Sequence, residues 1–288
     1  MTTNWDNIFV GRQSLLDQLL NSSKDCFIFG ARRIGKTSLL RELEKRFPEQ
    51  GIPAFYISLQ GLANSDKVKR KLGVAFRRKN FTVDEALLNE HTFFDFIDEL
   101  DIALTQPIVI LVDEAEEIQK LEQNEPGFMD RFRNIAESTE NIRFILAASP
   151  HFIRIASGTE CTCSAFLSDF DKHTLPVMSS DESCELMREF VEDITEEQME
   201  QVLSFTWYQP YLIRIFMSKL FRDDRLHYPS KEFAMDAYSS NALEGIFPNY
   251  LEGLDEDDQA LVHQIHKGEF KTDSKYEARL RQIVQYGY

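Results

Sequence analysis

The sequence predicts an α/β protein with a parallel sheet, because short apolar segments alternate with segments of helical spacing over the first 180 residues. The segments that read as strands are 26–29, 54–59, 108–112, 141–148 and, more weakly, 173–178. The third is a continuous aliphatic run, mostly β-branched, as expected for a strand that is buried on both faces. After Ser179 the pattern changes to helix after helix, which predicts a second, helical part.

Helices are expected between the strands and throughout the second part. Leu15, Leu16, Leu19 and Leu20 follow helical spacing within 8–21. Further helices are expected at 38–46, 64–80, 92–104, 180–191, 196–205 and 210–221, and two more within 255–288. The resulting domain map has an α/β core at 1–178, a helical part at 179–235 and the start of a third domain at 236–288, which we expect to be truncated at Tyr288.

Composition and charge narrow the class of protein. The 288 residues are 43% hydrophobic and 28% charged, which is typical of an ordinary globular protein of about two domains at roughly 150 residues each. No apolar run approaches the roughly 18 residues of a membrane helix, and the first residues do not resemble a secretion signal. The net charge of −16 argues against a protein that mainly coats nucleic acid.

The four cysteines form no disulfide pattern, which favours a cytoplasmic chain with reduced thiols. Cys161 and Cys163 are one residue too close for a usual zinc pair, and His263 and His266 are also one residue too close. A zinc site is therefore not expected.

One basic cluster stands out in the acidic chain, and a solvated helix face is the preferred interpretation, with nucleic acid as the alternative partner. Its members are Lys67, Lys69, Arg70, Lys71, Arg77, Arg78 and Lys79. The phenylalanines at 93, 94 and 96 are interpreted as core residues rather than as a binding stripe.

Residues 30–37, Gly-Ala-Arg-Arg-Ile-Gly-Lys-Thr, match the phosphate-loop pattern G-x-x-x-x-G-K-[ST] and stand between a predicted strand and a predicted helix. Glycines let the backbone wrap around phosphates with its N–H groups pointing inward, and the helix N-terminus adds positive potential. Lys36 is expected to reach the β- and γ-phosphates, and Thr37 to ligate Mg²⁺. The predicted nucleotide-binding residues of this segment are Gly30, Arg32, Arg33, Ile34, Gly35, Lys36, Thr37 and Ser38.

The apolar run 108–112 ends in Asp113 and Glu114, about 75 residues after the phosphate loop. Asp113 is expected to hold Mg²⁺ together with Thr37, and Glu114 to orient or deprotonate the attacking water. The alternative for Glu114 is a solvated acid in the run with Glu116 and Glu117. Ser149, at the end of the next strand, is expected to sense the γ-phosphate or the water; the alternative is a serine that only ends a strand.

These residues resemble the signal-transduction (STAND-type) P-loop ATPases, in the branch labelled archaeal-type ATPase or AAA-like domain. The sequence of residues 29–40 is typical of that branch. Arg133 resembles an arginine that is usual in the helix after the Mg²⁺-binding acid, here Asp113. The resemblance implies an ASCE/AAA+-like P-loop core, with residues 179–235 as a helical lid and residues 236–288 as a partial winged-helix-like domain. It implies that Val10, Gly11 and Arg12 lie against adenine and ribose. It also implies that Pro210 contacts nucleotide from the lid.

Two features of the sequence depart from the family pattern. Trp207 and Tyr208 stand where the lid usually has two glycines, and Asp169 lies in the stretch that often carries an arginine acting across a subunit interface. An arginine finger is worth ~10³–10⁵ in rate, so its loss implies slow turnover or a finger from elsewhere, with Arg154 the nearest candidate.

The function expected from the resemblance is an ATP-binding switch with slow Mg²⁺-dependent hydrolysis to ADP and phosphate. We expect it to act in signal transduction or antiviral defence, with a protein partner or by self-assembly and without a membrane. No guanine-reading motif is present, so ATP and ADP are preferred over guanine nucleotides. Two alternatives stay open: an origin-recognition-like AAA+ ATPase that binds DNA, and a non-catalytic module that retains nucleotide as a structural part.

Overall fold

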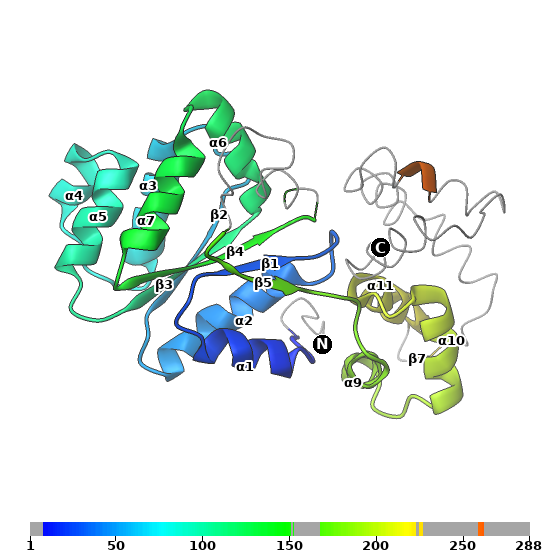
Figure 1. Ribbon diagram of the computed structural model, residues 1–288. Helices are drawn as coiled ribbons and strands as arrows, with labels where there is room; N and C mark the ends of the chain where they lie inside the picture. The colour runs from blue at the N-terminus through cyan, green and yellow to red at the C-terminus, as the bar shows by residue number, and fades with distance from the viewer. Residues whose placement is uncertain (1–7, 151, 153–167, 223–224, 227–258, 262–288) are drawn as a thin grey trace. The chain divides into compact units, whose positions relative to one another are not determined.

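The computed structural model describes residues 8–150, 152, 168–222, 225–226 and 259–261 (Figure 1). The chain divides into two compact units: a sheet unit of residues 14–29 and 36–173, and a helical unit of residues 1–13, 30–35 and 174–288. Apart from 259–261, the predicted winged-helix-like domain at 236–288 lies outside the described residues. The same holds for Arg154, Cys161, Cys163, His263 and His266.

The sheet has five strands in the order β2-β3-β4-β1-β5 (Figure 1). They are β1 (Cys26–Phe29), β2 (Ala54–Ser58), β3 (Ile108–Asp113), β4 (Ile142–Ala148) and β5 (Asp171–Thr174). β4 pairs in parallel with both β1 and β3, and β2 pairs in parallel with β3. The carboxyl ends of β1 and β3 therefore lie on either side of the end of β4, which is the arrangement expected of an ASCE-type P-loop core.

The first four strands confirm the sequence predictions to within a residue, and the fifth differs. β5 ends at Thr174, whereas the prediction placed a strand at 173–178. Asp171 donates its N–H to the carbonyl of Asp25, just before β1, so pairing begins earlier than the apolar pattern indicates. A short polar strand at the edge of a sheet lacks the alternation that sequence reading detects.

Helices cover both faces of the sheet, giving three layers in this unit (Figure 1). α2 (Lys36–Glu49) packs against β2, β3 and β4, whereas α3 (Ser65–Arg78) packs on β2 and α7 (Phe128–Ser138) on β4 from the other face. α5 (Phe93–Ala103) packs between α3 and α7, with α4 (Glu85–Glu90) and α6 (Ile118–Asn124) beside them. α1 (Gln13–Asn21) is shorter than the predicted 8–21, because Gly11 and Arg12 adopt left-handed backbone angles that helices exclude.

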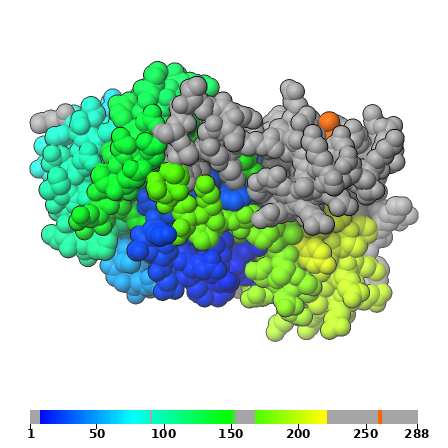
Figure 2. All heavy atoms as spheres, viewed as in Figure 1, coloured from blue at the N-terminus to red at the C-terminus, as the bar shows by residue number. Residues whose placement is uncertain are grey.

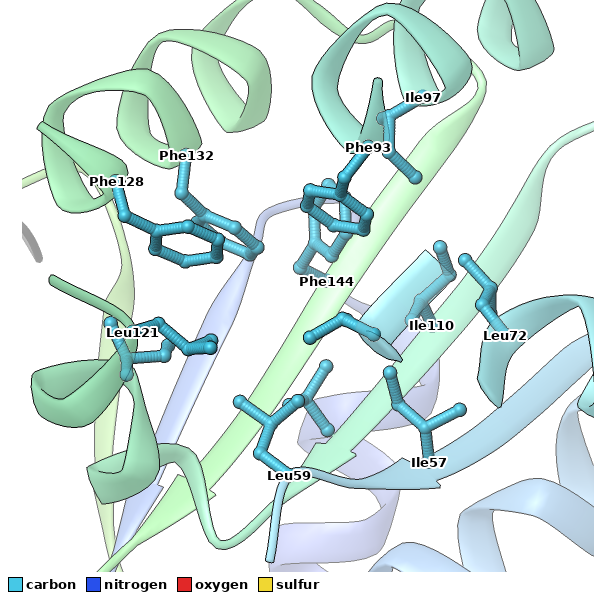
Figure 3. A pocket seen from close by; sticks show the side chains of 13 residues that line it. Ile57, Leu59, Leu72, Phe93, Ile97, Ile110, Leu121, Phe128, Phe132 and Phe144 are labelled. Carbon is cyan, nitrogen blue, oxygen red and sulfur yellow. The ribbon is translucent and has the colours of Figure 1, made fainter. Parts of the chain in front are cut away.

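The core of the sheet unit lies between the sheet and α3, α5 and α7. Phe93, Phe128 and Phe132 from the helices and Ile110 and Phe144 from the strands converge there (Figure 3). They enclose a cavity of about 20 Å³ lined only by apolar side chains. Such a space offers a water no hydrogen-bond partner, so it is a packing gap rather than a ligand site.

The helical unit packs three helices around its own core: α9 (Ser180–Phe190), α10 (Glu196–Thr206) and α11 (Pro210–Leu220), followed by the short ribbon of β6 (Phe221–Arg222) and β7 (Arg225–Leu226). All three helices confirm the predicted ranges to within a residue. Ser179 with Glu182, and Thr195 with Gln198, form capping boxes that fix where α9 and α10 begin. Within the described residues, no helix is both long and apolar enough to cross a membrane.

Candidate functional site

The phosphate-loop segment connects β1 to α2 and has the backbone geometry of an anion-binding turn. Arg33 and Gly35 adopt positive φ angles of 61° and 107°. A Cβ placed on Gly35 would meet no atom within 4 Å, so the space beside this backbone is open to a ligand. Successive N–H groups in such a turn form a concavity that binds anions.

Gly30 opens the loop at a crowded position. A Cβ there would lie 2.6 Å from the carbonyl oxygen of Leu175 in the helical unit, so only glycine allows this approach. Ile34 is buried, whereas Arg32, Arg33 and Ser38 are exposed. The loop therefore has a buried anchor and an accessible basic side.

Thr37 and Asp113 come together across the sheet unit. The Thr37 hydroxyl donates to Asp113 Oδ2 at 2.7 Å, which links the first turn of α2 to the end of β3. Asp113 is only 3% exposed, and Lys36, one residue before Thr37, is 9% exposed. A hydroxyl oxygen beside a carboxylate is the kind of oxygen donor set that Mg²⁺ takes, so these residues fit the ion that the sequence predicts.

Glu114 follows Asp113 in a left-handed conformation, with φ 53° and ψ 44°. This backbone is uncommon for a residue with a side chain, and such strain gathers at functional sites. The Glu114 N–H donates to Asp113 Oδ1 at 3.0 Å, so the turn also holds the neighbouring carboxylate. The predicted general base is thus half-buried at the carboxyl end of β3.

Ser149 is buried at the end of β4, directly after the pair formed by Ala148 and Phe29, the last residue before the phosphate loop. Its N–H donates to Glu116 Oε2 at 3.3 Å. Glu116 therefore contacts the backbone of the next strand, and the acidic run after Asp113 is not uniformly solvated.

Val10, Gly11 and Arg12 lie against α9 and its preceding loop in the helical unit. The Arg12 guanidinium donates to the carbonyls of Pro176, at 2.5 Å, and Val177, at 3.1 Å, and the Arg12 N–H donates to Glu182 Oε1. Burial lowers the pKa of Arg12, and the Glu182 carboxylate partly offsets this. The Arg12 side chain is therefore bound by protein carbonyls. Contact of residues 10–12 with adenine and ribose stays a prediction.

Pro210 begins α11, and its neighbours contact the phosphate loop within the helical unit. Gln209 is buried, caps α11 through Oε1 and donates from Nε2 to the Arg33 carbonyl at 3.2 Å. The Arg33 guanidinium lies 4.2 Å from the centre of the Tyr211 ring. Trp207 and Tyr208, at the positions where the resembled family usually has two glycines, adopt positive φ angles of 44° and 60°.

Sequence reasoning missed Tyr56, Glu182 and Gln209. Tyr56 donates from its hydroxyl to Asp113 Oδ2 at 2.8 Å, and burial with the nearby Asp113 charge raises its pKa. Burial raises the pKa of Glu182, but hydrogen bonds from the Arg12 and Ser179 N–H groups outweigh it and hold the pKa below its usual value. The capping-box pattern of Ser179 and Glu182 could have pointed to Glu182 from the sequence. No sequence pattern points to Tyr56.

Comparison with known proteins bears on the fold. A family model described as AAA domain matches residues 22–155. No match to a curated protein was found.

Among solved structures, the chain is similar to a Walker-type ATPase of Pyrococcus abyssi (15% identity, 96% of this chain and 89% of that chain covered, TM-score 0.67). It is also similar to the ORC2 protein of Aeropyrum pernix in ADPNP–ADP complexes (15%, 96% and 81%, 0.63). A third similar structure is the Aeropyrum pernix ORC1 protein in complex with DNA (13%, 93% and 74%, 0.54). These likenesses show a shared fold, and the match to the AAA-domain model at residues 22–155 covers the phosphate loop and strands β1 to β4.

Proposed function

We propose that the chain is an ATP-binding switch that hydrolyses ATP slowly with Mg²⁺ and acts in signalling or defence within a larger or multi-subunit assembly. The hydrogen bond between Thr37 and Asp113 carries the proposal, because it joins the phosphate-loop hydroxyl to the acid that ends β3. The AAA-domain match and the fold of nucleotide-bound relatives support ATP or ADP as the ligand.

Each residue has a distinct role in the proposal. The loop amides around Gly35 hold the phosphates, and the Lys36 ammonium neutralises the β- and γ-phosphate oxygens. Thr37 and Asp113 hold Mg²⁺, which when bound offsets the charge on those oxygens. Glu114 orients the attacking water and accepts its proton.

The switch is read out within the helical unit through the phosphate loop. Arg33 contacts Gln209 through its carbonyl and Tyr211 through its guanidinium, both at the start of α11. A nucleotide that prefers one conformation of the loop therefore biases α11. The bias equals the difference in its affinity for the two states.

Slow hydrolysis is proposed because Asp169 lies in the stretch where related enzymes often carry an arginine finger. A finger supplied by a partner or by a second copy would raise the rate by ~10³–10⁵. The basal rate then acts as a timer for the switch rather than as a source of flux.

Phosphate release by the wild-type chain and by Glu114→Gln tests this function. We expect Glu114→Gln to lose most turnover while ATP affinity persists, because only the proton acceptor is removed. Glu117→Gln is the matched control, since Glu117 is an acid of the same turn whose carboxylate pairs with Lys120 at 2.7 Å. Tightly retained ADP with no turnover in the wild type would instead favour the non-catalytic module.

A DNA-binding function is the second candidate, supported by the likeness to the DNA-bound ORC1 fold and by the exposed face of α3. Lys67, Arg70, Arg77 and Arg78 are exposed there, whereas Lys69 is buried and donates to the His91 carbonyl. Duplex binding that falls steeply with salt would support this candidate. A blank gel shift at low salt would remove it.

A further inference from the structure

We propose that Tyr56 is a positioning residue for Asp113, whose hydroxyl sets how strongly nucleotide binding depends on Mg²⁺. The inference rests on the proposed function, because it concerns the same Mg²⁺–nucleotide site. Tyr56 and Thr37 both donate to the same oxygen, Asp113 Oδ2, at 2.8 and 2.7 Å.

The sheet register brings Tyr56 to this oxygen. β2 and β3 are parallel neighbours in which Ser58 is paired with Asp113 and Tyr56 with Leu111. Because side chains alternate between the faces of a strand, Tyr56 and Ser58 point to the same face as Asp113. That face is covered by α2, whereas Ile57 and Ile110 point into the apolar core on the other side (Figure 3).

One face of α2 holds the tyrosine in place. Thr37, Arg41 and Glu44 have the i, i+4, i+7 spacing that aligns side chains along a helix. The Arg41 guanidinium lies 3.4 Å from the centre of the Tyr56 ring, and Glu44 Oε1 accepts the Tyr56 N–H at 3.2 Å. Arg41 and Glu44 also pair with each other at 2.9 Å, so ring and strand are fixed by the same helix that carries Thr37.

Three donors then fix the Asp113 carboxylate: the hydroxyls of Thr37 and Tyr56 on Oδ2 and the Glu114 N–H on Oδ1. Hydrogen bonds to a charged acceptor are short and strong, and this carboxylate is 3% exposed, so water cannot readily replace a lost donor. A partner that orients a metal ligand in this way contributes to metal affinity without touching the metal.

Removal of a residue that orients a metal ligand without touching the metal typically lowers metal affinity by about 10–100-fold. Tyr56 is one of three donors, so we expect Tyr56→Phe to reduce the Mg²⁺-dependent gain in nucleotide affinity by roughly threefold to tenfold. Affinity measured in EDTA should not change, because the loop amides and Lys36 do not depend on Tyr56.

The test is equilibrium binding of a fluorescent ATP analogue to wild type, Tyr56→Phe and Ser58→Ala, each in Mg²⁺ and in EDTA. Ser58→Ala is the matched control, because it removes a hydroxyl from the same face of the same strand, where its oxygen accepts the Gln60 N–H. The readout for each protein is the ratio of its affinity in Mg²⁺ to its affinity in EDTA. A smaller fraction of folded protein lowers both affinities alike and therefore leaves this ratio unchanged. Arg41→Met, which removes the guanidinium from the ring, should lower the same ratio by less.

A reduced ratio in Tyr56→Phe with an unchanged ratio in Ser58→Ala supports the inference. An unchanged ratio in Tyr56→Phe, beside a clear Mg²⁺ effect in the wild type, overturns the inference and leaves the proposed function intact. Should Tyr56→Phe fail to fold, an unchanged ratio in Arg41→Met overturns it. Absence of any Mg²⁺ effect in the wild type overturns both.

Discussion

Asp25 offers a quantitative test of the sheet unit, because burial at the start of β1 raises its pKa from 3.8 to about 6. The Phe144 N–H, which donates to Asp25 Oδ1 at 2.7 Å, and the nearby Arg143 charge oppose this rise without cancelling it. The folded state therefore binds the Asp25 proton more tightly than the unfolded state. Ionised Asp25 then destabilises the fold, and we expect Asp25→Asn to be stabilising at neutral pH.

The magnitude follows from the shift. Each pKa unit corresponds to about 1.4 kcal/mol, so two units give about 3 kcal/mol when Asp25 is fully ionised in both states. Asp25 is only partly buried, so roughly 1–3 kcal/mol is the realistic range. Asparagine keeps an oxygen for the Phe144 N–H, and the gain from removing the charge should dominate.

The assay is urea unfolding of wild type and Asp25→Asn at several pH values. The variant should be more stable by roughly 1–3 kcal/mol above pH 6, and the difference should shrink toward zero as pH falls from 6 to 4. Asp193→Asn, at an exposed aspartate after α9, is the matched control. A difference that is constant with pH, or a variant less stable than wild type at pH 7.5, would refute the reasoning.

The remaining predictions concern stability. Gly30→Ala should lower the free energy of unfolding by about 1–3 kcal/mol, because its Cβ would lie 2.6 Å from the Leu175 carbonyl oxygen. An unchanged melting temperature would contradict this close contact. Gly35→Ala should lower the free energy of unfolding by about 1–2 kcal/mol through the positive φ of this residue alone. A stability equal to wild type would contradict this backbone conformation. Glu182→Gln should lose about 1 kcal/mol at pH 7 in urea unfolding, because Glu182 accepts the Arg12 N–H. Since the pKa of Glu182 is lowered, that loss should fade as pH drops below 4.5; a loss that grows in acid would count against the pair.

The sequence predicted the elements whose pattern is local. The buried strand β3 follows from a continuous run of aliphatic residues, and the strand–loop–helix around Gly35 follows from the spacing of the phosphate-loop motif. β5 was misplaced because a polar edge strand is defined by its pairing with the segment before β1 rather than by its own side chains.

The candidate site divides in the same way. Lys36, Thr37 and Asp113 were predicted because motif spacing fixes their chemistry. Tyr56 was not, because its contact with Asp113 depends on which strands are neighbours and in which register. Gln209 likewise contacts Arg33 only because the start of α11 packs on the phosphate loop within the helical unit, which a linear pattern does not encode.

ATP binding in the presence of Mg²⁺, compared between wild type and Lys36→Ala, tests the central claim most directly. Lys45→Ala is the matched control, since Lys45 is exposed on the same helix and pairs with Glu42 at 3.3 Å. Loss of charge-assisted hydrogen bonds to phosphate predicts that Lys36→Ala binds ATP roughly 10–100-fold more weakly, while Lys45→Ala binds as wild type does. Equal ATP affinity in wild type and Lys36→Ala would contradict a triphosphate site at this loop.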